Sequence, residues 1–452
     1  MTLLNELSAE VCQRARMSRD PRFDGRFFVA VKTTGIFCRP ICPANLPKEE
    51  NVEYFSSQAL AVSAGYRPCL RCLPESAPHS WAWKGAETTF LRALTLIEQG
   101  ELDGSLETLA SRLGISDRYL RQLFQRHLGM PPKQYAQIQQ LMFAKQLLHT
   151  SQISITEVAY ASGFQSTRRF NDAFQKLFRL TPTQVRRERA ALPSRNHLSL
   201  AFRGPFDWAH MLDFYRLRAI EGMELIDEQS YQRHFVLGEG TGWFKASMAQ
   251  SHLDIEFEME RLSDLRHLVA RLRRMFDLDA DLISIEAHLE QLAPGLVRRT
   301  GIRIPGVWNA WEAGVRAVLG QQVSVKAAIG QLNLLVSTLA ASEGSTRYFP
   351  TPEQVQMSDL SFLRMPERRK ETLKRLADYV RLHPMDSPMA WLSLSGIGPW
   401  TVDYAQLRGE SRSHCFLTGD LIVKKALAKF PQLTAESVAP WGSYATFHCW
   451  SH

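Results

Sequence analysis

The sequence predicts a multidomain protein, mainly helical with α+β parts, whose modules follow one another along the chain. Three observations indicate this: four cysteines in two close pairs near the N-terminus, an internal repeat within residues 85–190, and a glycine-rich turn followed by an aspartate near the C-terminus. At 452 residues the chain is long enough for three or four domains of ordinary size. With 45% apolar and 22% charged residues, it has the composition of a globular protein.

The first module, residues 1–80, contains four cysteines spaced for a metal ion. Cys38 and Cys42 form a C-x3-C pair, and Cys69 and Cys72 form a C-x2-C pair. Zinc prefers four tetrahedral ligands, and two short loops that each supply two thiolates need only be brought together by folding. We therefore expect one bound zinc here. The simplest role of such a centre is structural, because it holds a small module closed.

The stretches around these cysteines, FFVAVKTTGIFCRPICPANLPKEENVEYF and ALAVSAGYRPCLRCLP, resemble the N-terminal domain of Ada-type proteins that sense DNA alkylation. The resemblance implies that Cys38 accepts a methyl group from a methylated DNA phosphotriester, with the other three cysteines as zinc co-ligands. Methylation would remove one negative charge from a centre that faces phosphates, and so tighten DNA binding. Thr34 and Arg67 match DNA contacts of that family, whereas Pro43 and Asn45 stand where the family can carry arginines.

The charge distribution and the cysteine usage suggest the partners and the compartment. Residues 1–200 carry a net charge of +9, residues 201–300 carry −5, and residues 301–452 carry +4, so the two ends suit DNA. The sequence opens without a basic and apolar leader, and no apolar run is long enough to cross a bilayer. The three remaining cysteines are scattered, which favours a reducing compartment. We expect a cytoplasmic, nucleoid-associated bacterial protein with no membrane partner.

The segment 85–190 contains two diverged copies of one unit. LETLASRLGISDRYLRQLFQRHLG aligns with ITEVAYASGFQSTRRFNDAFQKLF, and each copy reads as an apolar helix, a turn at a glycine and a second, basic helix. The pattern predicts two helix-turn-helix units joined by a helix over about 132–149, and it resembles the AraC-type DNA-binding domain. The candidate DNA contacts are equally consistent with solvated surface residues. They are Ser116, Asp117, Arg118, Arg121 and Gln122 in the first unit, and Gln165, Ser166, Thr167, Arg168 and Arg169 in the second.

The segment 197–290 differs in pattern from the helical repeat before it. Short alternating runs such as HLDIEFEME, interrupted by helical stretches, predict a small α+β domain. It resembles the N-terminal domain of AlkA-type DNA glycosylases. We expect no catalytic constellation within it.

The last segment, 300–452, contains LSGIGPWTVDYAQLRGE followed by FLTGDLIVKKAL. Gly396 and Gly398 allow a turn to approach a phosphate, and Pro399 can open the next helix, which predicts a helix-hairpin-helix that grips DNA through backbone amides. A GxG alone is weak evidence. Asp420, however, lies where helix-hairpin-helix glycosylases keep a catalytic carboxylate. Its alternative role is the N-cap of the helix LIVKKAL, and one residue can do both.

Residues 197–452 as a whole resemble AlkA-type 3-methyladenine glycosylases, with WNAWEAGVRAVLGQQVSVKAA, FPTPEQV and PWGSYATFHCW as further matching stretches. The resemblance implies that Trp400, Tyr404 and Trp450 form the pocket for a flipped, electron-poor base. It also implies that Asp420 stabilises the oxocarbenium-like sugar while water attacks. The alternative is that Trp400 and Tyr404 only pack the hairpin.

Several departures and absences refine this expectation. Gln322 stands in place of a family leucine that wedges into the base stack, and Ser451 replaces a pocket tyrosine. The second hairpin helix, WTVDYAQL, lacks the lysine of bifunctional relatives, so we expect base removal alone. No group of four closely spaced cysteines follows, so no iron–sulfur cluster is expected. A PCHRV-like acceptor stretch is also lacking, and repair of O6-alkylguanine is not expected.

Together these features predict a fusion of an Ada-type regulator with an AlkA-type glycosylase. The resemblance implies excision of 3-methyladenine and related bases from alkylated double-stranded DNA. It also implies activation of genes at promoter DNA after methylation of Cys38, with RNA polymerase as a partner. Two alternatives stay open: a zinc-dependent regulator whose glycosylase domain binds lesions but is catalytically weak, and a structural DNA-binding protein with a zinc clasp.

Overall fold

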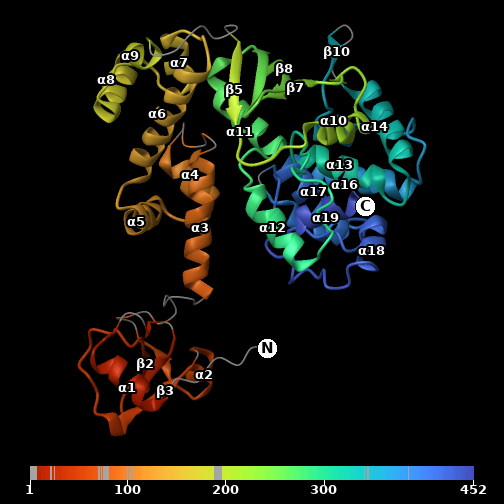
Figure 1. Cartoon of the computed structure of the whole chain (residues 1–452). Coiled ribbons are helices and arrows are strands. Elements are labelled where there is room, and N and C mark those ends of the chain that lie inside the picture. The colour runs from red at the N-terminus through yellow and green to blue at the C-terminus, as the bar shows by residue number, and fades with distance from the viewer. Residues whose placement is uncertain are drawn as a thin grey trace. The chain divides into compact units, whose positions relative to one another are not determined.

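The computed structural model forms two compact units, Met1–Gln139 and Gln140–His452 (Figure 1). In the part of the chain that is described, no helix is long and apolar enough to cross a membrane. The described residues are 8–20, 23–24, 26–56, 58–69, 72, 74, 81–98, 100, 102, 105–187, 196–340, 342–343, 346–384 and 386–451.

The N-terminal module is a four-stranded sheet in the order β3-β1-β2-β4. Strand β1 pairs antiparallel with β2 and β3, whereas β2 and β4 run parallel. Alternate residues of β1 point to opposite faces, so Val29 belongs to one small apolar cluster and Ala30 to another. Cys38 ends β2, and Cys69 directly follows β4. The elements are α1 (Ala9–Met17), β1 (Phe28–Val31), β2 (Ile36–Cys38), η2 (Glu49–Asn51), β3 (Val52–Phe55), α2 (Gln58–Ser63) and β4 (Arg67–Pro68).

The predicted repeat is confirmed as two helix-turn-helix units. In the first, Ser116 caps the second helix and Gly114 makes the turn with φ of +68°. In the second, Ser166 caps the second helix and Gly163 makes the turn with φ of +84°. The linking helix α6 ends one residue beyond the predicted end. The helices are α3 (Trp81–Glu98), α4 (Leu106–Arg112), α5 (Asp117–Leu128), α6 (Pro132–Thr150), α7 (Ile155–Ala161), α8 (Thr167–Phe178) and α9 (Pro182–Arg187).

The next segment has the predicted α+β architecture. Its five strands form an antiparallel sheet in the order β5-β9-β8-β7-β6. Alternate residues along β7 and β9 are buried on one face of this sheet, where helix α11 packs (Figure 1). The elements are β5 (His197–Ala201), α10 (Trp208–Arg216), β6 (Glu224–Ile226), β7 (Ser230–Leu237), β8 (Gly240–Met248), β9 (His252–Met259), η4 (Leu262–Asp264), α11 (Leu265–Met275) and α12 (Leu282–Leu292).

The C-terminal part is helical, and its central helix α13 is buried from Trp311 to Leu319. Helix α17 crosses α13 closely because Gly409 leaves room for the backbone of Ala310, where a Cβ would meet the Ala310 Cα at 2.5 Å. This crossing fixes α17, which carries Trp400 and Tyr404. The elements are α13 (Ala310–Gly320), α14 (Val325–Leu339), β10 (Ser342–Glu343), β11 (Thr346–Arg347), α15 (Pro352–Met357), α16 (Glu367–Leu382), η5 (Pro388–Ser393), α17 (Pro399–Glu410), α18 (Leu421–Leu427) and α19 (Gly442–Trp450).

Candidate functional site

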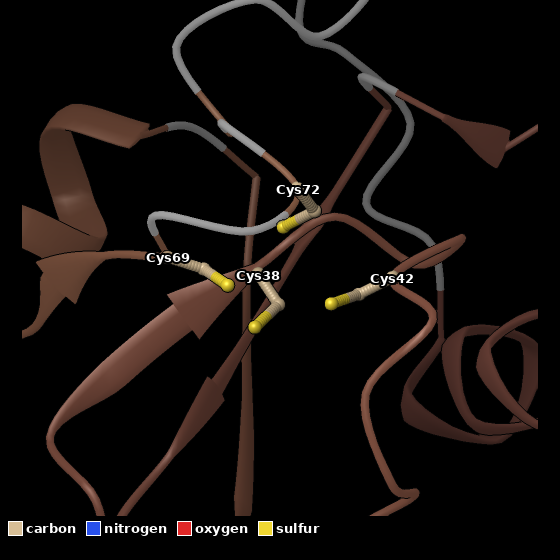
Figure 2. A group of neighbouring side chains, drawn as sticks. All are labelled: Cys38, Cys42, Cys69 and Cys72. Atoms are coloured by element: carbon tan, nitrogen blue, oxygen red, sulfur yellow. The ribbon is translucent and has the colours of Figure 1, made fainter.

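The four predicted zinc ligands converge on one point. The sulfur atoms of Cys38, Cys42, Cys69 and Cys72 all lie within 4.8 Å of one another and point toward a common centre (Figure 2). A tetrahedral zinc with Zn–S bonds of about 2.3 Å would hold its sulfurs about 3.8 Å apart, so the cluster fits that ion. Cys42 and Cys69 are buried, whereas Cys38 and Cys72 are partly exposed.

One arginine supports this cluster from outside. The backbone N–H of Arg39 donates to the Cys72 sulfur at 3.4 Å, and its guanidinium donates to the Cys72 carbonyl oxygen at 3.3 Å. The same guanidinium forms a bidentate ion pair with the buried Asp24. Such outer contacts orient metal ligands. Because the Arg39 amide stabilises negative charge on Cys72, the structure distinguishes the two partly exposed thiols.

The two predicted DNA contacts of this module lie on neighbouring segments. Thr34 is exposed in the β1–β2 turn, and Arg67 is exposed on β4. The Arg67 amide donates to the Gly35 carbonyl oxygen at 2.9 Å, which places this strand beside the turn. Cys38 follows the same turn at the end of β2, so all three residues belong to one part of the sheet.

The helix-turn-helix candidates divide into capping residues and exposed residues. Ser116 accepts from the Tyr119 amide and Ser166 from the Arg169 amide, both at 3.2 Å, so both serines cap their helices. Asp117 is held by Arg121 at 3.1 Å. Besides the cap Ser116, the exposed candidates are Arg118, Arg121, Gln122, Gln165, Arg168 and Arg169, whereas Asp117, Ser166 and Thr167 are partly buried.

A cavity of about 380 Å³ opens between helices of the α+β segment and the C-terminal segment. Its walls include the four residues predicted for the base pocket and its carboxylate, Trp400, Tyr404, Trp450 and Asp420. The rings of Trp400 and Tyr404 are stacked, with centroids 5.3 Å apart and an interplanar angle of 25°. The structure therefore brings these four side chains together around one space.

Asp420 caps a helix and lines the cavity at the same time. It is the N-cap of α18, where its Oδ1 accepts from the Ile422 and Val423 amides at 2.9 and 3.2 Å. The same oxygen accepts from the Trp450 indole at 3.1 Å, and the residue lines the cavity. The carboxylate is thus fixed by two helix termini while it faces the cavity.

The α+β segment, in which no catalytic constellation of its own was expected, supplies part of the cavity wall. Helix α10 and the residues after it supply His210, Asp213, Phe214, Leu217 and Arg218 to the cavity wall. The Phe214 ring stacks on Trp450 at 6.3 Å with an interplanar angle of 14°. Sequence reasoning missed this because α10 reaches the cavity through packing between distant segments. The aromatic and basic run DFYRLR was the one available signal.

The hairpin is formed by η5, a turn and α17. Gly396 has φ of +92°, and a Cβ there would lie 2.1 Å from the Thr372 hydroxyl oxygen, so only glycine fits. Gly398 is the N-cap of α17, and Pro399 opens that helix. The side-chain Nε2 of Gln321 donates to the Gly396 carbonyl oxygen at 3.2 Å and so ties the α13–α14 turn to the hairpin.

Gln322, the predicted wedge residue, lies at the apex of that turn. It is exposed and has φ of 56°, a left-handed conformation that residues other than glycine adopt rarely. Its neighbour Val323 is 42% exposed and lines the cavity. Gln322 therefore lies next to a residue of the cavity wall.

Three guanidinium groups act on Tyr404 at one end of the cavity. Arg408 donates to the Tyr404 hydroxyl at 2.9 Å. Burial would raise the pKa of Tyr404, but the positive charges of Arg408, Arg218 and Arg316 outweigh it and lower that pKa. Burial and the positive charges of Arg408 and Arg316 lower the pKa of Arg218 to about 10, so Arg218 stays charged at neutral pH. The surroundings of Tyr404 are therefore positively charged.

These sites define a class: a modular protein with a zinc-type thiolate centre, helix-turn-helix readers and a helix-hairpin-helix cavity that contains a carboxylate. Models of protein families match the same segments. The metal-binding domain of Ada matches residues 11–75, a helix-turn-helix domain matches residues 109–188, and the AlkA N-terminal domain matches residues 197–309.

Whole-chain similarity identifies the family. A protein of Mycobacterium tuberculosis, described as a probable bifunctional transcriptional activator/DNA repair enzyme AlkA, is 34% identical over 98% of this chain and 96% of its own length. The chain belongs to this family. DNA-3-methyladenine glycosylase 2 of Escherichia coli is 33% identical over 56% of this chain and 96% of its own. The Escherichia coli bifunctional transcriptional activator/DNA repair enzyme Ada is 35% identical over 38% of this chain and 47% of its own.

Proposed function

We propose that the chain is a bifunctional regulator and repair enzyme of the alkylation response, which hydrolyses the N-glycosidic bond of 3-methyladenine and related bases in double-stranded DNA. The observation that carries this proposal is Asp420, held by the α18 amides and by Trp450 at the wall of an aromatic cavity. A base turned out of the stack would lie against Trp400 and Tyr404. The sugar would then lie close to the carboxylate.

The hydrolysis follows from these positions. As the bond between the sugar and the base breaks, its electron pair leaves with the base and positive charge develops on the sugar. The Asp420 carboxylate stabilises that charge, and water adds to the sugar and gives up a proton. No lysine lies on the α17 stretch WTVDYAQL, so the product is an abasic site.

The proposed experiment compares the full-length protein with its Asp420→Asn variant on methylated duplex DNA. Released bases are measured by chromatography. We expect 3-methyladenine from the parent and none from the variant. Release from neither protein, with both folded, would overturn the enzyme and favour a regulator that only binds lesions.

We further propose that Cys38 accepts a methyl group from DNA methylphosphotriesters. Zinc, when bound, keeps the four sulfurs deprotonated. Cys38 is partly exposed and follows the turn that carries Thr34, whereas Cys72 already accepts the Arg39 amide. In the transfer, the Cys38 sulfur forms a bond to the methyl carbon and the phosphate oxygen leaves with its electron pair.

The proposed outcome is tighter binding to promoter DNA, with Arg118, Arg121, Arg168 and Arg169 as contacts and RNA polymerase as the partner. Peptide mass spectrometry after incubation with methylphosphotriester DNA should place one methyl group on Cys38. Cys415→Ser, a change of a buried cysteine in the other unit, is the control that keeps uptake. A methyl group on another cysteine would overturn Cys38 as the acceptor, and no methyl group at all would leave a structural zinc clasp.

A further inference from the structure

Arg218 is a charged side chain in the wall of the cavity with most of its donors unused. A guanidinium has five N–H donors. Within the described part of the chain, that of Arg218 makes one hydrogen bond, to the Phe214 carbonyl oxygen at 3.2 Å. It lies over the Phe214 ring at 3.7 Å from the centroid. Burying a cation whose N–H donors have no acceptors costs free energy, and a ligand in the cavity that supplies acceptors would offset that cost.

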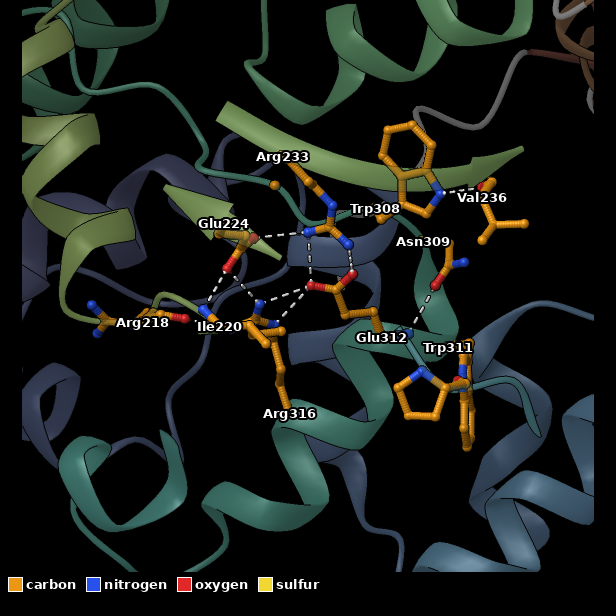
Figure 3. Close-up of polar contacts among 12 residues, drawn as sticks. Arg218, Ile220, Glu224, Arg233, Val236, Trp308, Asn309, Trp311, Glu312 and Arg316 are labelled. Atoms are coloured by element: carbon orange, nitrogen blue, oxygen red, sulfur yellow. Dashed lines mark hydrogen bonds and ion pairs between the residues drawn. The ribbon is translucent and has the colours of Figure 1, made fainter. Parts of the chain in front are cut away.

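The position of Arg218 is fixed by a buried network of four charged side chains. Arg316 donates to the Arg218 carbonyl oxygen at 2.9 Å (Figure 3). Arg316 is itself held by Glu312 at 2.8 Å, and Arg233 joins Glu312 to Glu224. This network links helix α13 to strands β6 and β7. The network therefore holds the backbone at Arg218, just after α10, in a fixed position in the cavity wall.

The network is electrically neutral, and Arg218 remains as a charged side chain in the cavity wall. Two arginines and two glutamates in it balance one another. Outside it, neither Arg218 nor Arg408 forms an ion pair with a described residue, and both cations act on Tyr404. The contacts of Asp420, in contrast, come from α18 and Trp450. The cavity wall therefore has the Arg218 guanidinium after α10, with Arg408 behind Tyr404, and the Asp420 carboxylate at α18. Asp213, the other carboxylate of the wall, pairs with Arg216.

This polarity matches the movement of charge in the proposed reaction. Breaking the glycosidic bond sends electrons to the base and leaves positive charge on the sugar. A guanidinium beside the base and a carboxylate beside the sugar both favour that movement. The benefit depends on the lesion. A base that is already cationic leaves as a neutral molecule, whereas an uncharged damaged purine takes up negative charge as it leaves.

We propose that Arg218 is a specificity-determining residue that donates hydrogen bonds to the O6 and N7 edge of an uncharged damaged purine and stabilises the negative charge which that base takes up on leaving. This rests on the proposed glycosylase activity. The departing base gains the electron pair of the glycosidic bond and then a proton. Water supplies the hydroxyl group to the sugar and releases a proton, so the products are the free base and an abasic site.

The test compares two lesions in the same duplex under single-turnover conditions. Hypoxanthine is an uncharged purine with acceptors at O6 and N7, and 7-methylguanine is a cation in DNA with N7 blocked. Each is offered to the full-length parent, to Arg218→Met and to Arg218→Lys. The control is Arg261→Met, which changes a surface arginine paired with Glu239 at 2.6 Å. Release of 7-methylguanine by each variant shows that its cavity is folded.

We expect Arg218→Met to lower the rate of hypoxanthine release at least about tenfold more than that of 7-methylguanine, with partial recovery in Arg218→Lys and no change in the control. Equal losses for both lesions would show that Arg218 only supports the wall and would overturn the proposal. Release of 7-methylguanine but not of hypoxanthine by the parent would also overturn the role of Arg218, but it would leave the proposed glycosylase activity supported. Release of neither base by the parent would remove the proposed activity itself.

Discussion

The indole N–H of Trp450 donates to Oδ1 of Asp420 at 3.1 Å, which joins the end of α19 to the start of α18. That oxygen also accepts two α18 amides, so three donors fix it. Trp450 in turn stacks on Phe214 and packs edge-on against Phe447 at 4.9 Å. One residue therefore both walls the cavity and orients its carboxylate.

Replacing Trp450 by phenylalanine separates these two roles. Trp450→Phe keeps an aromatic ring against Phe214 but removes the donor to Asp420. A hydrogen bond to a charged group contributes about 1.5–3 kcal/mol, so we expect single-turnover base release to fall about tenfold or more. Trp441→Phe, outside the cavity, is the matched control. An unchanged rate in Trp450→Phe would mean that the indole only packs.

Two substitutions of Asp420 distinguish the helix cap from the catalysis. Asparagine caps a helix about as well as aspartate, whereas alanine costs about 1 kcal/mol. We therefore expect Asp420→Asn to unfold in urea like the parent and Asp420→Ala to be less stable, while both lose base release. An Asp420→Asn variant that released bases at the parental rate would restrict Asp420 to its cap role.

The features that the sequence predicted are local in the chain. Two short cysteine loops, a repeat with its turn glycines and an N-cap aspartate are each set within a few neighbouring residues. The cavity wall is different in kind. Arg218 reaches it only because Arg316, nearly a hundred residues later, holds its carbonyl oxygen. The pairing of Arg233 with Glu312 across 79 positions is likewise set by packing between the sheet and α13. No local pattern indicates such contacts.

Asp277 makes the stability of the second unit depend on pH. Its carboxyl accepts from the Tyr444 hydroxyl at 3.0 Å and from the Ile304 amide at 3.2 Å. Burial outweighs these contacts and raises its pKa from 3.8 to about 7. Between these values the folded state binds more protons than the unfolded state, so stability falls as pH rises through this window.

Asp277→Asn should remove this pH dependence. Asparagine retains the shape, carries no charge and tolerates the φ of 52° at this position. We expect the parent to lose on the order of 1–4 kcal/mol of unfolding free energy between pH 4 and pH 8 relative to the variant. Urea denaturation followed by tryptophan fluorescence measures this. The control is Asp378→Asn, whose side chain is 46% exposed and which is not among the groups that shift the pKa of Asp277. Parallel pH profiles for parent and Asp277→Asn would contradict the prediction.

The hairpin turn depends on Gly396 for both shape and space. An alanine there would combine φ of +92° with a methyl group 2.1 Å from the Thr372 hydroxyl oxygen, so the turn must shift. We expect Gly396→Ala to lose more than about 1 kcal/mol of stability and to bind undamaged duplex DNA about tenfold more weakly, because the α17 amides move from their positions. Gly398→Ala, with nothing within 4 Å, should lose some stability, because alanine is a poorer N-cap than glycine, and should weaken DNA binding. Gly330→Ala, in an equally open place inside α14, should leave DNA binding unchanged and raise stability by up to about 1 kcal/mol, because alanine favours a helix interior. Urea denaturation and fluorescence anisotropy provide the two readouts. Parental stability and affinity in Gly396→Ala would show that the turn accommodates a side chain and that the proposed backbone grip on DNA lies elsewhere.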